Sequence, residues 1–136
     1  MHLLCFAAIL TVRGLYGPGR LDRTLYPYYK MDIDAGRITR DKALAMVCCE
    51  YILLNYAFTL PLPVIVGGID VSGKDVSNEL TAICVEADAL VGLVNPSLGL
   101  RVNDGTPREL LDLAAKSLLS GKTKPALFSD RTIVDG

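Results

Sequence analysis

The residues of this 136-residue chain that could carry out nucleophilic or metal chemistry are one histidine and four cysteines. Because His2 is the single histidine, the chain alone cannot build a two- or three-histidine metal site or a histidine-based catalytic triad. Cys5, Cys48, Cys49 and Cys84 lack the C-x-x-C spacing typical of zinc and redox sites. We expect buried, reduced thiols in a cytoplasmic protein, with zinc ligation or disulfide pairing as the alternatives.

The adjacent cysteines Cys48 and Cys49 invite a redox or nucleophilic interpretation. Neighbouring side chains on a helix point about 100° apart, and no cation stands nearby to favour a thiolate. We therefore expect both to pack in the core.

Four carboxylates offer acid, base or metal-binding groups. Glu79 and Glu86 share one face of an expected helix, but they lack a metal partner or a paired-carboxylate arrangement. We interpret them, with Asp70, as solvent-exposed, and we expect Asp75 to cap the N-terminus of its helix.

Arg101 is the charged residue with the most informative position, because it falls inside an expected apolar strand. A charge there is costly unless it is paired. Arg101 either holds a carboxylate of a substrate, forms an ion pair within the protein, or faces solvent. Gly67 and Gly68 end another strand where α/β proteins place ligand loops, although a tight turn explains them equally well.

Overall charge and hydropathy restrict the partners. Fourteen basic and 15 acidic residues give a net charge of −1, and the isoelectric point is near 5.7, so the chain has no basic field for nucleic acid or anionic membrane. The apolar run from Leu3 to Leu10 indicates a buried helix, with a secretory signal as the alternative. It is too short to span a membrane.

The first half of the chain is expected to be helical. A glycine-rich loop covers residues 14 to 20, and a Tyr-rich helical stretch follows, with Pro27 in the first turn of a helix that ends before Gly36. Thr39 is the expected N-cap of the next helix, which runs to about Phe58 and is apolar almost all round. We expect that helix to be deeply buried.

The second half alternates strands and helices. Val64–Val66 is expected to be a strand covered on both faces, residues 97–102 alternate like a second strand, and a third begins near Pro125. A helix is expected from about Asp75 to Val91. Another should begin with a capping box at Thr106 and end at Gly121. This order implies parallel neighbours, and therefore an α/β sheet or barrel.

Short sequence motifs spread along the chain resemble those of the large domain of glycyl radical enzymes, the family of pyruvate formate-lyase and the diol dehydratases. The resemblance covers about residues 5 to 130, and its specificity lies in the ordered set rather than in any one piece. The pieces are Gly19-Arg20-Leu21-Asp22, Leu25-Tyr26-Pro27-Tyr28-Tyr29-Lys30, Asp32-Ile33, Gly36-Arg37-Ile38-Thr39, Gly67-Gly68-Ile69-Asp70, Gly73-Lys74-Asp75, Asn78-Glu79-Leu80-Thr81, Asn95-Pro96-Ser97-Leu98, Arg101-Val102 and Gly105-Thr106-Pro107.

The resemblance implies a ten-stranded β/α barrel and a lyase or dehydratase of anaerobic metabolism, or formate acetyltransferase-like chemistry, acting on a small molecule. It implies a glycyl radical installed by a separate activating enzyme that uses S-adenosylmethionine and an iron–sulfur cluster. That radical oxidises a central cysteine, whose thiyl radical takes hydrogen from the substrate. The resemblance also implies a homodimer at full length.

Two family motifs are missing from this chain. It has neither the Gly-Cys-x-Glu loop of the reactive cysteine nor the Arg-Val-x-Gly-Tyr loop of the radical glycine. We assign no catalytic, cofactor-binding or metal-binding residue within it. The chain also lacks, before Gly19, the Asn-Gly-His-Ser motif by which glycerol-type members of the family hold substrate hydroxyls, which argues against a glycerol-like substrate. Our candidates for the lining of the substrate pocket are Tyr16, Ile65, Gly67, Gly68, Leu98 and Arg101.

We therefore expect residues 1–136 to be a fragment of a single barrel domain that is inactive by itself. Three strands cannot close a barrel, and a mean hydropathy of +0.35 is high for a small independent domain. The alternatives are a free-standing α/β binding or interaction module and a secreted cysteine-containing protein.

Overall fold

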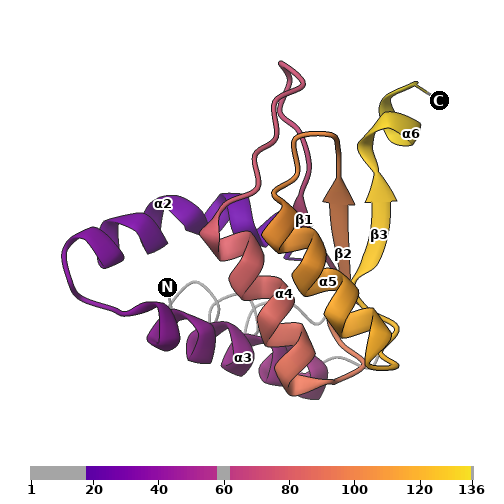
Figure 1. Cartoon of the computed structure of the whole chain (residues 1–136). Coiled ribbons are helices and arrows are strands. Elements are labelled where there is room, and N and C mark those ends of the chain that lie inside the picture. Colours follow the sequence, from indigo (N-terminus) through magenta and orange to yellow (C-terminus); the bar gives the residue numbers. More distant parts are fainter. Residues whose placement is uncertain (1–17, 58–61, 136) are drawn as a thin grey trace.

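The computed structural model describes residues 18–57 and 62–135. Helices and strands alternate through most of this part, with two helices first (Figure 1). In chain order they are α2 (Leu21–Asp34), α3 (Arg40–Ala57), β1 (Pro63–Gly67), α4 (Glu79–Val91), β2 (Ser97–Val102), α5 (Arg108–Leu119), β3 (Ala126–Ser129) and α6 (Asp130–Asp135).

The three strands form an open parallel sheet in the order β1-β2-β3. Val64 lies opposite Leu98 in the first ladder, and Leu100 lies opposite Leu127 in the second. Gly19 extends the β1 edge by a short parallel bridge, in which the Ile65 N–H donates to the Gly19 carbonyl at 2.9 Å. The expected α/β class and parallel strand order are confirmed.

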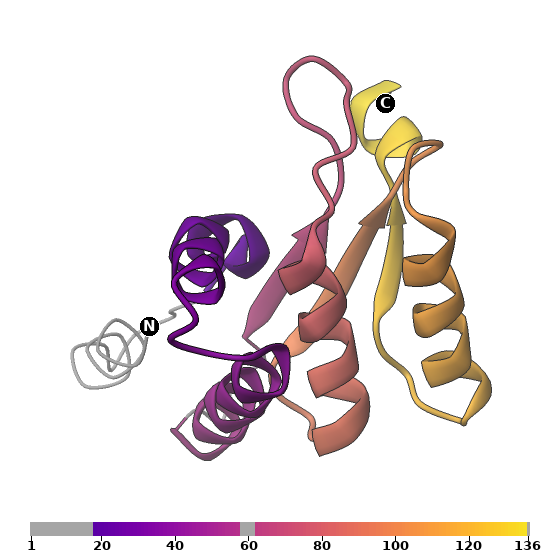
Figure 2. The ribbon, with the colours of Figure 1, turned by 60° about the vertical axis from the view of Figure 1, so that its left-hand side comes forward.

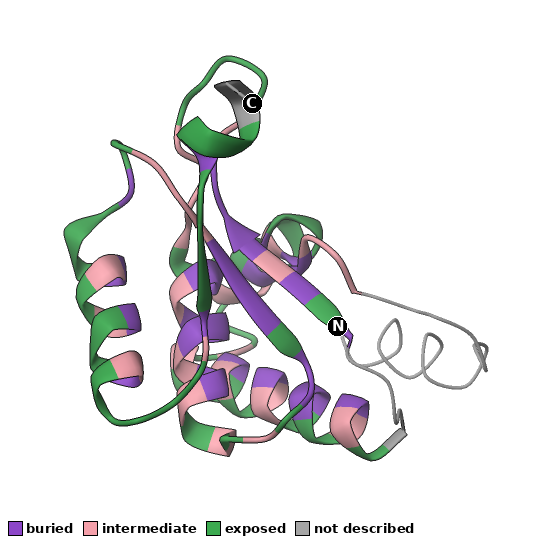
Figure 3. Ribbon diagram, turned by 90° about the vertical axis from the view of Figure 1, so that its right-hand side faces the viewer, coloured by how far each residue is buried: buried purple, intermediate pink, exposed green. Residues whose placement is uncertain are grey.

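The main helices of the described part pack on one side of the sheet (Figures 2 and 3). The buried core combines the inner faces of α2 to α5 with the alternate strand residues that face them. Its strand members are Val64, Val66, Leu98 and Leu100, each no more than 1% exposed. The opposite face of the sheet carries no helix among the described residues.

This one-sided arrangement corrects the expected environment of β1. Val64 and Val66 are fully buried, but Ile65, which points to the other face, is only half-buried. An unbroken β-branched run predicts a strand covered on both faces. Among residues 18–57 and 62–135, only the helix-covered face meets that condition.

Helix α2 differs from the expectation at Pro27, which lies in its second turn. A proline inside a helix removes one backbone hydrogen bond and costs about 3 kcal/mol. Leu21, Leu25 and Tyr29 lie at intervals of four residues on both sides of it and are buried. Their packing offsets the lost bond, and Gly36, with φ of +65°, ends the helix as expected.

Helix α3 begins as expected, because the Thr39 hydroxyl accepts a hydrogen bond from the Lys42 N–H at 3.2 Å. The expectation of deep burial on all sides was wrong. Val47 and Tyr51 face the core, whereas Tyr56 is 90% exposed and Ile52 is 49% exposed. The helix packs along α4 with one face and leaves apolar groups on the other.

The sequence predicted the N-termini of the helices in the second half less accurately than the other elements. Helix α4 begins at Glu79, and a reciprocal capping box joins Asn78 to Thr81. Asp75 therefore does not cap this helix. At α5 the expected capping box is absent, because the Thr106 hydroxyl accepts from the Asn103 N–H at 2.9 Å instead.

The expected helix at Leu3–Leu10 lies outside the described residues, as do Cys5 and most of the glycine-rich loop. No helix in residues 18–57 or 62–135 combines the length and apolar character needed to cross a membrane.

Candidate functional site

The carboxyl ends of the three strands meet at one edge of the sheet, where parallel α/β proteins place ligand sites. The register puts Gly67, Arg101 and Phe128 in one row across the sheet at this edge. A long loop follows β1 and projects beyond the sheet, and a shorter loop follows β2 (Figure 1).

Asp22 organises the end of β1 from the helix side. Its fully buried carboxylate accepts hydrogen bonds from the Gly67 N–H and the Thr81 hydroxyl, each at 2.8 Å. The Arg20 guanidinium donates to the Gly67 carbonyl, and its Nε lies 3.9 Å from Asp22 Oδ1. Partial burial lowers the pKa of Arg20, and the Asp22 carboxylate opposes that effect. The network fixes the backbone of Gly67 between α2 and α4.

Arg101 forms an ion pair within the protein. Its Nε lies 2.5 Å from Oδ1 of Asp130, a carboxylate that is 1% exposed. The side chain passes over Gly68, where a Cβ atom would meet Arg101 Nε at 2.9 Å and Cζ at 3.1 Å. With φ of +90°, Gly68 has a second reason to be glycine. Of the three alternatives for Arg101, the structure supports the ion pair.

A second polar cluster joins the loops after β1 and β2. Asp75 accepts from the Asn103 side-chain amide at 2.7 Å and from the Ser77 N–H at 3.0 Å. The same amide reaches Asp130 at 3.4 Å. These contacts connect the loops above β1 and β2 to the start of α6.

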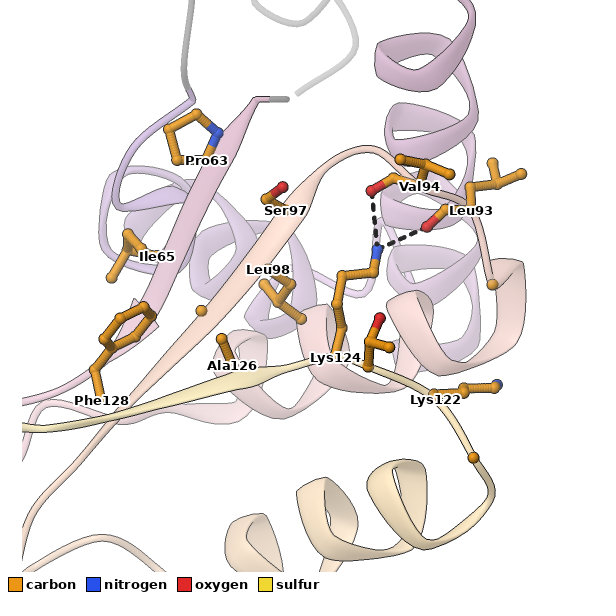
Figure 4. Close-up of a pocket in the computed structure, with 14 residues that line it drawn as sticks. Pro63, Ile65, Leu93, Val94, Ser97, Leu98, Lys122, Lys124, Ala126 and Phe128 are labelled. Carbon is orange, nitrogen blue, oxygen red and sulfur yellow. Dashed lines mark hydrogen bonds between the residues drawn. The ribbon is translucent and has the colours of Figure 1, made fainter. Parts of the chain in front are cut away.

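The uncovered face of the sheet is apolar below this edge. Ile65, Gly99 and Ala126 form the next row, and Phe128 leans over Gly99 toward Ile65 (Figure 4). These residues border an open cavity of about 690 Å³, whose far side is formed by Leu93 and the segment from Gly121 to Lys124.

Lys124 closes the opposite, amino-terminal edge of the sheet. Its Nζ donates to Asp88 Oδ1 at 2.6 Å and to the Pro96 carbonyl at 2.9 Å. It also donates to the Leu93 carbonyl at 2.7 Å, as Figure 4 shows. Asp88 is 2% exposed. This buried pair connects the end of α4 to the beginning of β3.

The pocket candidates from the sequence fall into three groups. Gly67, Gly68 and Arg101 come together at the carboxyl edge, and Ile65 lies on the uncovered face just below them. Leu98 borders the cavity, but its side chain is 1% exposed and belongs to the core. Tyr16 lies outside the described residues.

The sequence interpretation missed Asp22, Asp130, Phe128 and Lys124. Asp22 belongs to the Gly-Arg-Leu-Asp motif that contributes to the family resemblance, and this motif could have identified it. Asp130 and Lys124 find partners 29 and 36 residues away, and no local pattern identifies such pairs.

The cysteines in the described part show no activated thiol. Cys84 is fully buried, and burial raises its pKa to about 12. Burial also raises the pKa of Cys48. Cys49 is exposed, which corrects the expectation that both adjacent cysteines pack in the core. Within residues 18–57 and 62–135, no three His, Cys, Asp or Glu side chains are placed to hold a metal ion.

Comparison with known proteins gives concordant matches. Residues 2–136 match the family described as pyruvate formate lyase-like. The (2S)-3-sulfopropanediol dehydratase of Klebsiella oxytoca is 28% identical in a 133-residue alignment that covers 87% of this chain and 16% of the dehydratase.

Solved structures agree in fold as well as in sequence. A structure concerned with 1,2-propanediol dehydration in Roseburia inulinivorans is 34% identical, with a TM-score of 0.80 over 88% of this chain and 17% of that one. A glycyl radical enzyme from Archaeoglobus fulgidus is 33% identical, with a TM-score of 0.81 over 87% of this chain and 17% of that one. The chain thus spans about a sixth of the length of these relatives. It belongs to the pyruvate formate lyase-like family.

Proposed function

We propose that this chain is one segment of a glycyl radical enzyme, a lyase or dehydratase or a formate acetyltransferase-like enzyme acting on a small molecule. The observation that carries the proposal is the open three-stranded parallel sheet. The chain that contains this sheet matches a glycyl radical enzyme structure with a TM-score of 0.81, yet it covers only 17% of that enzyme. The uncovered face and the free edge of β3 are then surfaces that the rest of the barrel covers.

In this proposal the segment supplies part of the pocket wall. Gly67, Gly68 and Arg101 shape the carboxyl edge, and Ile65 lines the face below them. Leu98 supports β2 from the core side, and Tyr16 remains a candidate in the preceding loop. The buried pairs of Asp22 with Gly67 and of Asp130 with Arg101 hold this wall rigid.

The reacting groups belong to other parts of the full-length enzyme in this proposal. A glycyl radical and a reactive cysteine would supply the hydrogen abstraction, and an activating enzyme with S-adenosylmethionine and an iron–sulfur cluster would install the radical. We expect a cytoplasmic homodimer. The isolated 136-residue chain should be inactive, because it contains neither of the two reactive loops.

The test is to extend the reading frame on both sides of this segment and express the full-length protein anaerobically with its activating enzyme. We expect an electron paramagnetic resonance signal of a glycyl radical, and we expect both the Gly-Cys-x-Glu and the terminal glycyl loops in the frame. The 136-residue chain treated in the same way is the control and should give no radical.

Two results would contradict the proposal. One is a full-length frame that contains both loops but acquires no radical. The other is a frame confined to this segment whose product unfolds cooperatively and is monodisperse, which would favour the α/β binding module.

A further inference from the structure

The uncovered face of the sheet carries an aromatic ring at the edge where a substrate would bind. Phe128 is the third residue of β3 and shares a row with Arg101 and Gly67. It is 42% exposed in this chain. If the strands belong to a barrel, as proposed above, this ring faces the enclosed space.

The position of the ring depends on a glycine in the neighbouring strand. A Cβ atom on Gly99 would lie 2.7 Å from Phe128 Cε2 and 2.9 Å from Ile65 Cδ1. Because Gly99 has no side chain, the Phe128 ring packs against the backbone of β2 at Gly99, beside the Ile65 side chain (Figure 4). The three residues form a continuous apolar surface just below the carboxyl edge.

The polar group in the same row is already engaged. Arg101 pairs with the buried Asp130 at 2.5 Å and passes over Gly68. An arginine neutralised in this way is a poor site for a second anion, since its partner carboxylate would repel that anion. The row therefore presents hydrocarbon, rather than a free cation, to a ligand.

We propose that Phe128 is a specificity-determining residue of the enzyme, selecting small uncharged substrates that place a methyl or methylene group against its ring. This inference rests on the proposed function, because it needs the rest of the barrel to enclose the site. Ligands of parallel α/β proteins bind at the carboxyl ends of the strands, directly above this ring. A hydroxyl placed there would lose water without gaining a partner from Phe128, Ile65 or Gly99.

The test compares 1,2-propanediol with glycerol, which differ by a methyl against a hydroxymethyl group. Their dissociation constants are measured by saturation-transfer NMR on the full-length protein without activation, so that the result does not depend on the radical. We expect 1,2-propanediol to bind about tenfold more tightly than glycerol. In Phe128→Ser the preference should fall to about twofold or less, and Phe128→Leu should retain most of it.

Leu127→Ser is the matched control. Leu127 is the preceding residue of β3, is 50% exposed and points to the opposite face. Its substitution should leave the ratio of the two dissociation constants unchanged, and circular dichroism should verify that all three variants are folded.

The inference is overturned if glycerol binds as tightly as 1,2-propanediol, if neither diol binds, or if Phe128→Ser leaves the preference intact. These outcomes are separate from those for the proposed function, which is judged by the glycyl radical signal. A protein that forms the radical but shows no dependence on Phe128 would retain the function and lose the specificity assignment.

Discussion

The two faces of the sheet are made of the same three strands, yet their side chains are buried to different extents. On the helix-covered face Val64, Val66 and Leu100 are fully buried. On the uncovered face Phe128 is 42% exposed, and Ile65 is half-buried. The described residues thus bury one face of the sheet and leave the other open, as expected if the proposed full-length barrel covers it. Stability should therefore depend on the covered face, and ligand selection on the uncovered one.

The largest loss of stability is expected for Asp22→Ala, on the covered side. It leaves the Gly67 N–H and the Thr81 hydroxyl without their acceptor and removes the carboxylate beside Arg20. We expect a loss of about 3–4 kcal/mol in the free energy of unfolding, measured by urea denaturation.

Asp32→Ala is the matched control, an aspartate in the same helix whose partner is the exposed Arg37. Its loss should stay below about 1 kcal/mol. Equal losses in the two variants would mean that the buried Asp22 network does not stabilise the fold.

The two faces can be compared directly with Leu100→Ala and Phe128→Ala. Leu100 is fully buried against the helices, so its truncation leaves a cavity and should cost about 3 kcal/mol. Phe128 should cost less than about 1 kcal/mol in this chain, because its ring is half open to solvent. Urea denaturation of both variants measures the two losses in the free energy of unfolding. If Phe128→Ala loses as much as Leu100→Ala, the uncovered face is packed rather than open.

A smaller effect is expected at the amino-terminal edge, for Lys124→Met. The substitution leaves the Asp88 carboxylate buried without its cation and should cost about 2 kcal/mol. Lys122→Met, which removes an exposed hydrogen bond to the Ala89 carbonyl, should change stability by less than about 0.5 kcal/mol. Thermal unfolding of both variants tests this difference, which should vanish if Lys124 is only a surface residue.

The smallest contribution to stability at neutral pH is expected from the titration of Cys84 in the covered core. This contribution becomes destabilising, and grows, as the pH rises into the alkaline range. Its pKa is raised to about 12 by burial, whereas an unfolded thiol titrates near 9.0. Above pH 9 the unfolded chain loses a proton that the folded chain keeps, so stability should fall as pH rises toward 12. Burial raises the pKa of Tyr51 in the same direction.

The check is urea denaturation between pH 7 and pH 10.5 for the unchanged chain and for Cys84→Ala. The variant should lose stability in alkali less steeply, because Cys48 and Tyr51, whose pKa values burial also raises, remain. Identical pH profiles would contradict the assignment of a buried, protonated thiol at this position.

Local patterns predicted the strands better than the helix ends. The alternation of Leu98, Leu100 and Val102 located β2 at its observed bounds, because period-2 burial is written directly in the sequence. Helix starts were less accurate. A Thr-Pro-x-Glu pattern at Thr106 satisfied the rule for a capping box, but the hydroxyl met the Asn103 N–H first. Asn78 formed the real box at α4.

The candidate site was predictable in place but not in its pairings. Gly67 and Gly68 marked the end of β1 because ligand loops and tight turns both need glycine there. Which carboxylate would meet Arg101 was not predictable, since Asp130 becomes its neighbour only when β2 and β3 pair.

The sequence by itself determined the α/β alternation, the positions of the three strands and the family resemblance, because these depend on residue types at short, regular spacings. Tertiary structure alone decided that the described helices cover only one face of the sheet, that Asp22 holds the end of β1, and that Phe128 lies over Gly99. Each of these depends on residues distant in sequence coming into contact, and such contacts are set by packing and charge pairing rather than by local pattern.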